Sequence, residues 1–200
     1  MSPPRRAIIT ITSAHAPLFE GTHTTGAFVT EVLHPYKVLT AAGFDVDITS
    51  EKGTYTPDWL SLTPDFLSGD DLAIWNDTSS PSMKIAATVW DNGGIVSSVC
   101  HGPAVFHDLV DTATGEPLIK GKTITGFTTE AETVMHLQDE LKSWKTPLVE
   151  ETAEAMGAIY KRSSGVWDDY HVVDGQLVTG QNPASATSTA KAVVDAFEKL

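Results

Sequence analysis

Residues 93–106 read GGIVSSVCHGPAVF and contain an abrupt change from a strand pattern to a helix pattern. The apolar run 95–99 is rich in β-branched residues, which predicts a short buried strand. Cys100 ends this run, and residues 104–106 begin a helix-like run. A strand that turns sharply into a helix lifts the residue at the turn out of the packed layers. We call this turn, residues 99–103, the elbow.

Cys100 at the tip of the elbow is the only cysteine in the chain. The backbone N–H groups that open a helix favour a thiolate and can hold an oxyanion, so the position suits a nucleophile. Free cysteines are also among the most buried residue types, and packing is therefore the alternative interpretation. A single cysteine excludes an internal disulfide framework and a CxxC metal site.

The chain before the elbow has the order of a parallel α/β fold. Residues 7–11 are a β-branched run that predicts a central strand, and residues 13–26 form a polar loop. Residues 28–42 have apolar side chains at helical spacing, and residues 44–49 predict a second strand. The order strand, loop, helix, strand is the beginning of a parallel sheet. A long polar loop follows at 50–71.

The remaining elements are short, and no internal linker or repeat interrupts them. We therefore expect residues 1–200 to form a single domain. Helices are predicted at 83–90, directly after the elbow to about 110, and at 130–141, 147–157 and 183–200. Strands are predicted at 123–127, 158–162, 171–173 and 177–179, and the Asp174-Gly175 pair predicts a hairpin between the last two.

Bulk composition excludes several classes of function. Of the 200 residues, 41% are hydrophobic and 20% are charged, which is typical of a globular protein. The net charge of −13 argues against binding to nucleic acid or to an anionic membrane. No segment has the length of a transmembrane helix, and the N-terminal apolar run is too short for a signal peptide. We expect a cytoplasmic protein, with the nucleus as the alternative.

A nucleophilic cysteine needs a base, and the base usually needs a third group to orient it. His101 follows Cys100 directly, and at a sharp turn both side chains can line one pocket. Glu130 and Glu132 follow the predicted strand 123–127, where α/β sheets place functional loops, and Glu31 lies near the start of the first helix. Most glutamates are solvated surface residues, so spacing alone does not decide which of these carboxylates belongs to the site.

Motifs spread over most of the chain carry a more specific signal. They combine E-x-x-H-P at 31–35, S-x-C-H-G-P-A at 98–104 and T-G-x-N-P-x-S at 179–185. Together with the surrounding stretches 25–53, 92–106, 115–132 and 166–190, they resemble the ThiJ/PfpI superfamily, also called class I glutamine amidotransferase-like. Within it, the chain is similar to the fungal glutathione-independent glyoxalases that double as stress chaperones.

The resemblance implies a flavodoxin-like three-layer sandwich with a mostly parallel central sheet. It implies that Cys100 is the nucleophile, His101 its neighbouring histidine, Glu132 the acidic member of the triad and Glu31 a proton-carrying carboxylate. The implied reaction converts methylglyoxal and water to D-lactate, a lyase activity of the glyoxalase III type, with glyoxal as another small aldehyde substrate. No metal or organic cofactor is implied, and the family commonly forms homodimers.

Residues 66–83 depart from the family pattern because they are too short. Family members carry a further strand and a Gly-His turn there, which would lie at the centre of the sheet and supply part of the oxyanion hole. Residues 71–75, DLAIW, could form a shortened replacement strand. We favour the other interpretation, in which the segment around 71–83 is absent and the sheet loses a central strand.

Three alternatives to a competent glyoxalase remain at this stage. A shortened chain could be catalytically impaired. A stress chaperone could act through apolar side chains that the lost strand exposes, for which the candidates are Trp59, Leu60, Leu62, Phe66, Leu67, Ile74 and Trp75. A redox sensor or deglycase-type protein could use Cys100 differently, since an accessible thiolate can be oxidised.

Overall fold

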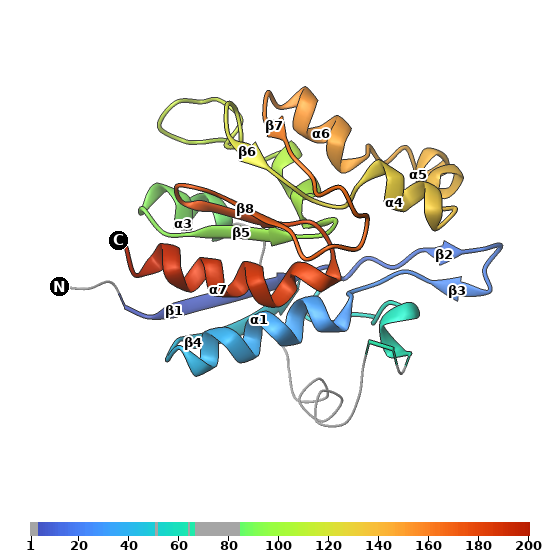
Figure 1. Cartoon of the computed structure of the whole chain (residues 1–200), viewed down its shortest axis with the longest axis horizontal. Helices are drawn as coiled ribbons and strands as arrows, with labels where there is room; N and C mark the ends of the chain where they lie inside the picture. The colour runs from blue at the N-terminus through green and yellow to red at the C-terminus, as the bar shows by residue number, and fades with distance from the viewer. Residues whose placement is uncertain (1–3, 51, 64, 67–84) are drawn as a thin grey trace. The chain divides into compact units, whose positions relative to one another are not determined.

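The computed structural model describes residues 4–50, 52–63, 65–66 and 85–200, and it contains two compact units (Figure 1). The first unit comprises residues 1–84 and the second residues 85–200. Both combine helices with parallel strand pairs, which confirms the predicted α/β class. The expectation of a single domain over 1–200 stays a prediction. Residues 67–83, where the shortened segment was predicted, lie outside the described residues.

The first unit is built on one strand–helix–strand motif. Strand β1 (Arg6–Ile11) pairs in parallel with β4 (Asp45–Ser50), in a register that places Ile9 beside Ile48. Helix α1 (Val29–Ala41) connects them, as predicted. The predicted loop 13–26 contains a small hairpin that sequence reasoning missed, and a short 3-10 helix follows later; these elements are β2 (Pro17–Leu18), β3 (His23–Thr24) and η1 (Leu60–Leu62).

Helix α1 packs on the strand pair through its apolar face. Val29, Val32 and Leu33 are buried with Ile48 of β4, and half-buried Ile9 of β1 packs against them. The chain leaves the helix through Gly43 at a φ of +81°, a left-handed conformation that glycine adopts without steric cost. The apolar spacing therefore predicted correctly both the buried face of α1 and the region where the helix ends.

Strand β1 is less buried than a central parallel strand should be. Its residues alternate between exposed and half-buried, and Ile8 is 42% exposed. Among the described strands, β1 pairs with β4 alone. Central parallel strands are normally covered on both faces.

Four of the residues predicted to form a chaperone surface are described. Leu62 and Phe66 are exposed, but Phe66 makes an edge-to-face contact with Phe28. Trp59 is half-buried and stacks on His23 with ring centroids 4.1 Å apart. Leu60 is half-buried, and Leu67, Ile74 and Trp75 lie outside the described residues. The chaperone hypothesis therefore stays a prediction.

The second unit contains a three-stranded sheet and a separate strand pair. The sheet has the order β5-β9-β8, in which β5 (Val96–Val99) runs parallel to β9 (Leu177–Gly180) and β8 (His171–Asp174) antiparallel to it. Gly175, at a φ of 63°, makes the predicted hairpin turn between β8 and β9. Strands β6 (Thr123–Ile124) and β7 (Ile159–Tyr160) form a parallel pair.

Short helices surround these strands. They are α3 (Ile85–Asp91), η2 (Gly102–His107), α4 (Thr129–Val134), α5 (Gln138–Trp144), α6 (Val149–Ala155), η3 (Pro183–Ser185) and α7 (Ala186–Phe197). The single helix predicted at 130–141 is two helices, separated where His136 adopts a φ of 58°. A residue with left-handed backbone cannot continue a right-handed helix.

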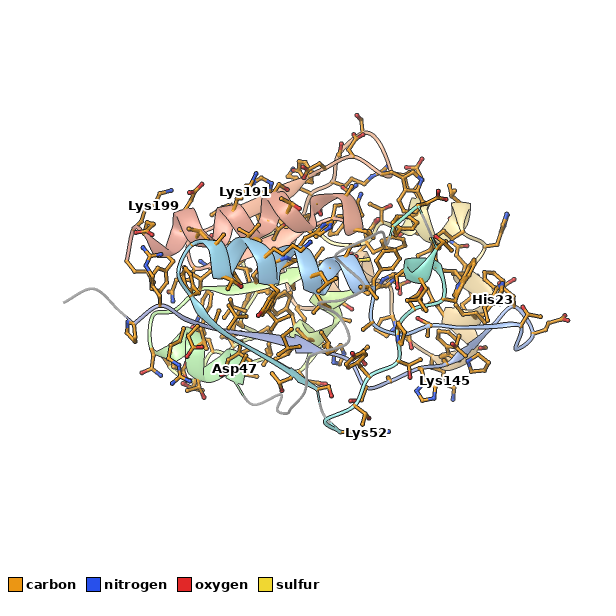
Figure 2. All side chains as sticks on the ribbon, turned by 90° about the horizontal axis from the view of Figure 1, so that it is seen from below. His23, Asp47, Lys52, Lys145, Lys191 and Lys199 are labelled. Carbon is orange, nitrogen blue, oxygen red and sulfur yellow. The ribbon has the colours of Figure 1, made fainter. Side chains whose placement is uncertain are left out.

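Helix α7 closes the unit against the sheet. Ala192 and Ala196 are buried with Val178 of β9. Lys191 extends from the opposite, solvent-facing side of the helix (Figure 2). Small side chains on the inner face let the helix approach β9 closely, and the helix covers one face of the parallel pair of β5 and β9. The elbow begins where β5 ends.

Candidate active site

The backbone of the elbow is held on both sides in an unusual conformation. Cys100 follows β5 directly and has a φ of 59°, a left-handed conformation that costs a non-glycine residue about 1 kcal/mol or more. Its N–H donates to the carbonyl of Gly180 at 3.0 Å, and its own carbonyl accepts from the Phe127 N–H at 2.7 Å. The end of β9 and the segment that follows β6 thus impose the turn, which confirms the predicted elbow.

The helix after the elbow is shorter and tighter than the sequence suggested. It is the 3-10 helix η2, which begins at Gly102 and ends at His107. Pro103 stands in its first turn, where the missing N–H costs nothing. A six-residue 3-10 helix has a smaller dipole than the α-helix expected to run to about residue 110. The side-chain partners of Cys100 therefore matter more than the helix field.

Cys100, His101 and Glu132 form a connected chain of side chains. The Cys100 Sγ lies 3.3 Å from His101 Nδ1, and His101 Nε2 lies 2.7 Å from Glu132 Oε1. Both ring nitrogens of His101 are thereby engaged, one by the thiol and the other by the carboxylate. Three of the four predicted site residues are therefore brought together by the fold.

The two glutamates that spacing left open occupy different environments. Helix α4 begins at its cap Thr128, whose Oγ1 accepts from the Ala131 N–H at 3.0 Å. This start turns Glu132 inward, where its side chain is only 4% exposed. Glu130, two residues earlier, points outward, is half exposed and pairs with Arg162. Helical periodicity thus assigns Glu132 to the site and Glu130 to the surface.

Glu31 lies in the other unit, in the first turn of α1. It is half-buried. Its proposed part in proton transfer stays a prediction.

Phe127 and Tyr160 belong to the surroundings of the triad, and sequence reasoning missed both. The Phe127 ring is buried beneath His101, with centroids 4.4 Å apart and planes tilted by 31°. The Tyr160 hydroxyl donates to the carbonyl of Gly126 at 2.7 Å, which holds the strand end that supports Cys100. Its position at the end of the predicted strand 123–127 was the available signal for Phe127.

The geometry defines how a proton can move. A carboxylate only accepts hydrogen bonds, so Glu132 selects the His101 tautomer that carries its proton on Nε2. Nδ1 is then free to accept the Cys100 proton. The resulting imidazolium would be stabilised by the buried carboxylate, and the His101 side chain is 51% exposed. Such an arrangement can activate a thiolate nucleophile.

The variant Tyr160→Phe tests the support of this site through the pH dependence of stability. Burial, with a smaller contribution from Glu150, raises the pKa of Tyr160 above its ordinary value of 10.0. In alkaline solution the unfolded chain releases a proton that folded Tyr160 keeps, so the wild-type protein loses up to about 1.4 kcal/mol of stability per pH unit from this group. The variant lacks this loss.

We therefore expect Tyr160→Phe to be less stable than wild type by about 1 kcal/mol at neutral pH, because the bond to Gly126 is missing. The deficit should shrink at each step above about pH 10. Urea unfolding across this range measures both effects. A deficit that stays constant with pH would contradict the raised pKa of the half-buried phenol.

Comparison with curated proteins finds full-length relatives. Glyoxalase 3 of Candida albicans is 38% identical over 232 aligned positions, which cover 96% of this chain and 98% of the relative. The glutathione-independent glyoxalase HSP31 of Saccharomyces cerevisiae is 37% identical over 234 positions, covering 98% of this chain and 99% of the relative. The chain belongs to the glutathione-independent glyoxalase family. This membership confirms the resemblance inferred from the motifs.

Solved structures agree with the family. Glyoxalase III from Candida albicans superposes with a TM-score of 0.92 at 37% identity, covering 98% of both chains. A ThiJ/PfpI domain protein from Brachyspira murdochii superposes with a TM-score of 0.54 at 15% identity, which shows a shared fold alone. No protein-family model matches the sequence. None of the helices in the described residues is long and apolar enough to cross a membrane.

The glyoxalase alignments also bear on the shortened segment. Both span more positions than the 200 residues of this chain, so each relative carries residues that have no counterpart here. This agrees with the prediction that a segment is absent. Its predicted place around residues 71–83 lies outside the part of the chain that the structure describes.

Proposed function

We propose that this protein is a glutathione-independent glyoxalase that converts methylglyoxal and water to D-lactate. The observation that carries the proposal is the connected set of Cys100, His101 and Glu132, with separations of 3.3 and 2.7 Å. The names of the full-length relatives support the same activity. The cytoplasmic location and the homodimer that the family implies are proposed with it.

The first step is attack of the Cys100 thiolate on the aldehyde carbon of methylglyoxal. His101 Nδ1 takes the thiol proton and returns it to the new alkoxide, so the product is a neutral hemithioacetal. Glu132 holds the ring orientation and stabilises the transient imidazolium. No external thiol is required, because Cys100 takes the part that glutathione would play.

The second stage moves hydrogen between the two carbons without an external oxidant. A base removes the proton from the former aldehyde carbon to give an enediol, and a proton is delivered to the neighbouring carbon. The former aldehyde carbon is thereby oxidised and the former ketone carbon reduced, which leaves an S-lactoyl thioester on Cys100. Water then hydrolyses the thioester and releases lactate. His101 and Glu31 are the proposed proton carriers.

The decisive experiment is an assay of the purified chain with methylglyoxal in the absence of glutathione. Consumption of methylglyoxal should be matched by formation of D-lactate in equal amount. Absence of turnover would remove the proposal and favour the catalytically impaired variant. A redox-sensing role would instead be supported by selective oxidation of Cys100 under mild peroxide, detected by mass spectrometry.

Glu132→Gln tests the orienting carboxylate. The amide keeps the shape of the side chain but cannot stabilise an imidazolium, so kcat/KM should fall by about a hundredfold or more. Glu130→Gln is the matched control, because Glu130 lies in the same helix and points to solvent. The control should stay within about twofold of wild type. Equal losses in both variants would contradict the assignment of Glu132.

A further inference from the structure

The loop formed by residues 163–168 is pinned by two buried amide side chains. Gln181 and Asn182, which follow β9, are fully buried. Asn182 Nδ2 donates to the carbonyls of Val166 and Asp168 at 3.0 and 2.9 Å. Gln181 Nε2 donates to the carbonyls of Gly165 and Val166, each at 3.2 Å. Four hydrogen bonds from fully buried donors fix the path of a surface loop.

The loop is also braced from within. Asp168 accepts from the Gly165 N–H at 2.9 Å and from the Ser163 hydroxyl. The Ser163 N–H donates to Gln181 Oε1 at 2.9 Å. Because Gly180, one residue before Gln181, holds the Cys100 N–H, the same strand end positions both the loop and the elbow. The position of the 163–168 loop is therefore fixed relative to Cys100.

This pinned loop presents a half-exposed indole near Phe127, the ring that packs against His101. Trp167 is 49% exposed, although its neighbour Val166 packs against the cluster that contains Cys100. The Trp167 ring lies 6.0 Å from the Phe127 ring, and Phe127 in turn lies 4.4 Å from His101. A row of three rings thus joins His101 to Trp167 through Phe127. The solvent-exposed half of the indole is available for contact with a bound molecule.

We propose that Trp167 is a specificity-determining residue, whose indole contacts the substituent of the aldehyde bound at Cys100 and favours apolar and aromatic substituents over hydrogen. The identity of that aldehyde as an α-oxoaldehyde rests on the proposed function. The contact itself rests on the row of rings and on the pinned loop. Glyoxal, methylglyoxal and phenylglyoxal differ only in that substituent, so they form a graded set of probes.

The first experiment compares kcat/KM for phenylglyoxal and glyoxal. In Trp167→Ala the ratio of the two values should fall about five- to tenfold, the worth of one aromatic contact, with a smaller fall for methylglyoxal against glyoxal. Trp167→Phe should restore most of the ratio. Trp144→Ala is the matched control, since Trp144 is an exposed tryptophan of α5 in the same unit. The control should leave the ratio unchanged.

The second experiment does not depend on glyoxalase turnover. Because Cys100 is the only cysteine, its alkylation by phenacyl bromide and by iodoacetamide can be followed by intact mass spectrometry. Each reagent transfers its carbon group to the thiolate and releases halide. The rate ratio of the aromatic to the small reagent should fall about fivefold or more in Trp167→Ala and should not change in Trp144→Ala.

The outcomes separate this inference from the proposed function. A wild-type protein that turns over no aldehyde removes the function, yet a Trp167-dependent alkylation ratio would still support the contact. Ratios that are the same in wild type and Trp167→Ala would overturn the inference, even in an active enzyme. Equal changes in Trp144→Ala would overturn it as well, because they would show an effect of tryptophan loss in general.

Discussion

Cys100→Ala is expected to abolish glutathione-independent turnover of methylglyoxal, with a loss of about a thousandfold or more. The loss should fall on kcat, because the missing sulfur forms the bond on which every later step depends. The neighbouring His101 and Glu132 cannot replace it, since neither can form the thioester. Formation of D-lactate from methylglyoxal is the measurement.

The same variant should fold normally. Alanine keeps a Cβ at the left-handed position and removes only one buried sulfur, so the stability change should stay within about 2 kcal/mol. A circular dichroism melt therefore separates loss of chemistry from loss of structure. Cys100→Ser is a second control, which should also be inactive because a hydroxyl is far less acidic than a thiol. Full activity in either variant would refute the nucleophilic role of Cys100.

Gly126→Ala is expected to damage both the stability and the activity of the second unit. An alanine Cβ at this position would lie 2.7 Å from Val149 Cγ1, 2.9 Å from Pro103 Cγ and 3.0 Å from the Cys100 carbonyl oxygen. A proline ring and a backbone oxygen cannot swing aside, so the strand end must move away from the elbow. Such overpacking costs about 1–3 kcal/mol, and the melting temperature should fall by roughly 3–10 °C.

The shift should also weaken the bond from the Phe127 N–H to Cys100 and displace the ring beneath His101. Displacements of about 1 Å in a catalytic group can cost about a hundredfold in rate, which is the loss we expect. Gly121→Ala is the control, because that site has open space and a φ of +74°. It should lose about 1 kcal/mol of stability through backbone strain and keep its activity. Normal activity in Gly126→Ala would contradict this role of Gly126.

Local pattern was sufficient to predict much of the fold. The β-branched run before Cys100 predicted β5, apolar spacing predicted α1, and Asp174-Gly175 predicted the hairpin of β8 and β9. Each of these features depends on residues close together in the chain. Local pattern failed at residues 130–141, because the break near His136 has no glycine or proline to announce it.

The candidate site was predictable in part. Cys100 and His101 are adjacent in sequence, and the family motifs named Glu132 as their partner. Spacing by itself could not choose between Glu130 and Glu132, because both follow the same strand. The cap residue Thr128 sets where α4 begins, and this start turns Glu132 inward and Glu130 outward.

The α/β class, the family and the elbow that carries Cys100 could all be predicted from the residues alone. How that elbow is held became visible in the folded chain, because its supports are Gly180, Phe127 and Tyr160 from distant parts of the sequence. Hydrogen bonds and ring contacts between such residues leave no periodic trace in a single sequence. For the same reason, the sequence did not predict Trp167, which lies 67 positions after Cys100, as a specificity-determining residue. It became a candidate only because the buried amides of Gln181 and Asn182 fix the position of its loop.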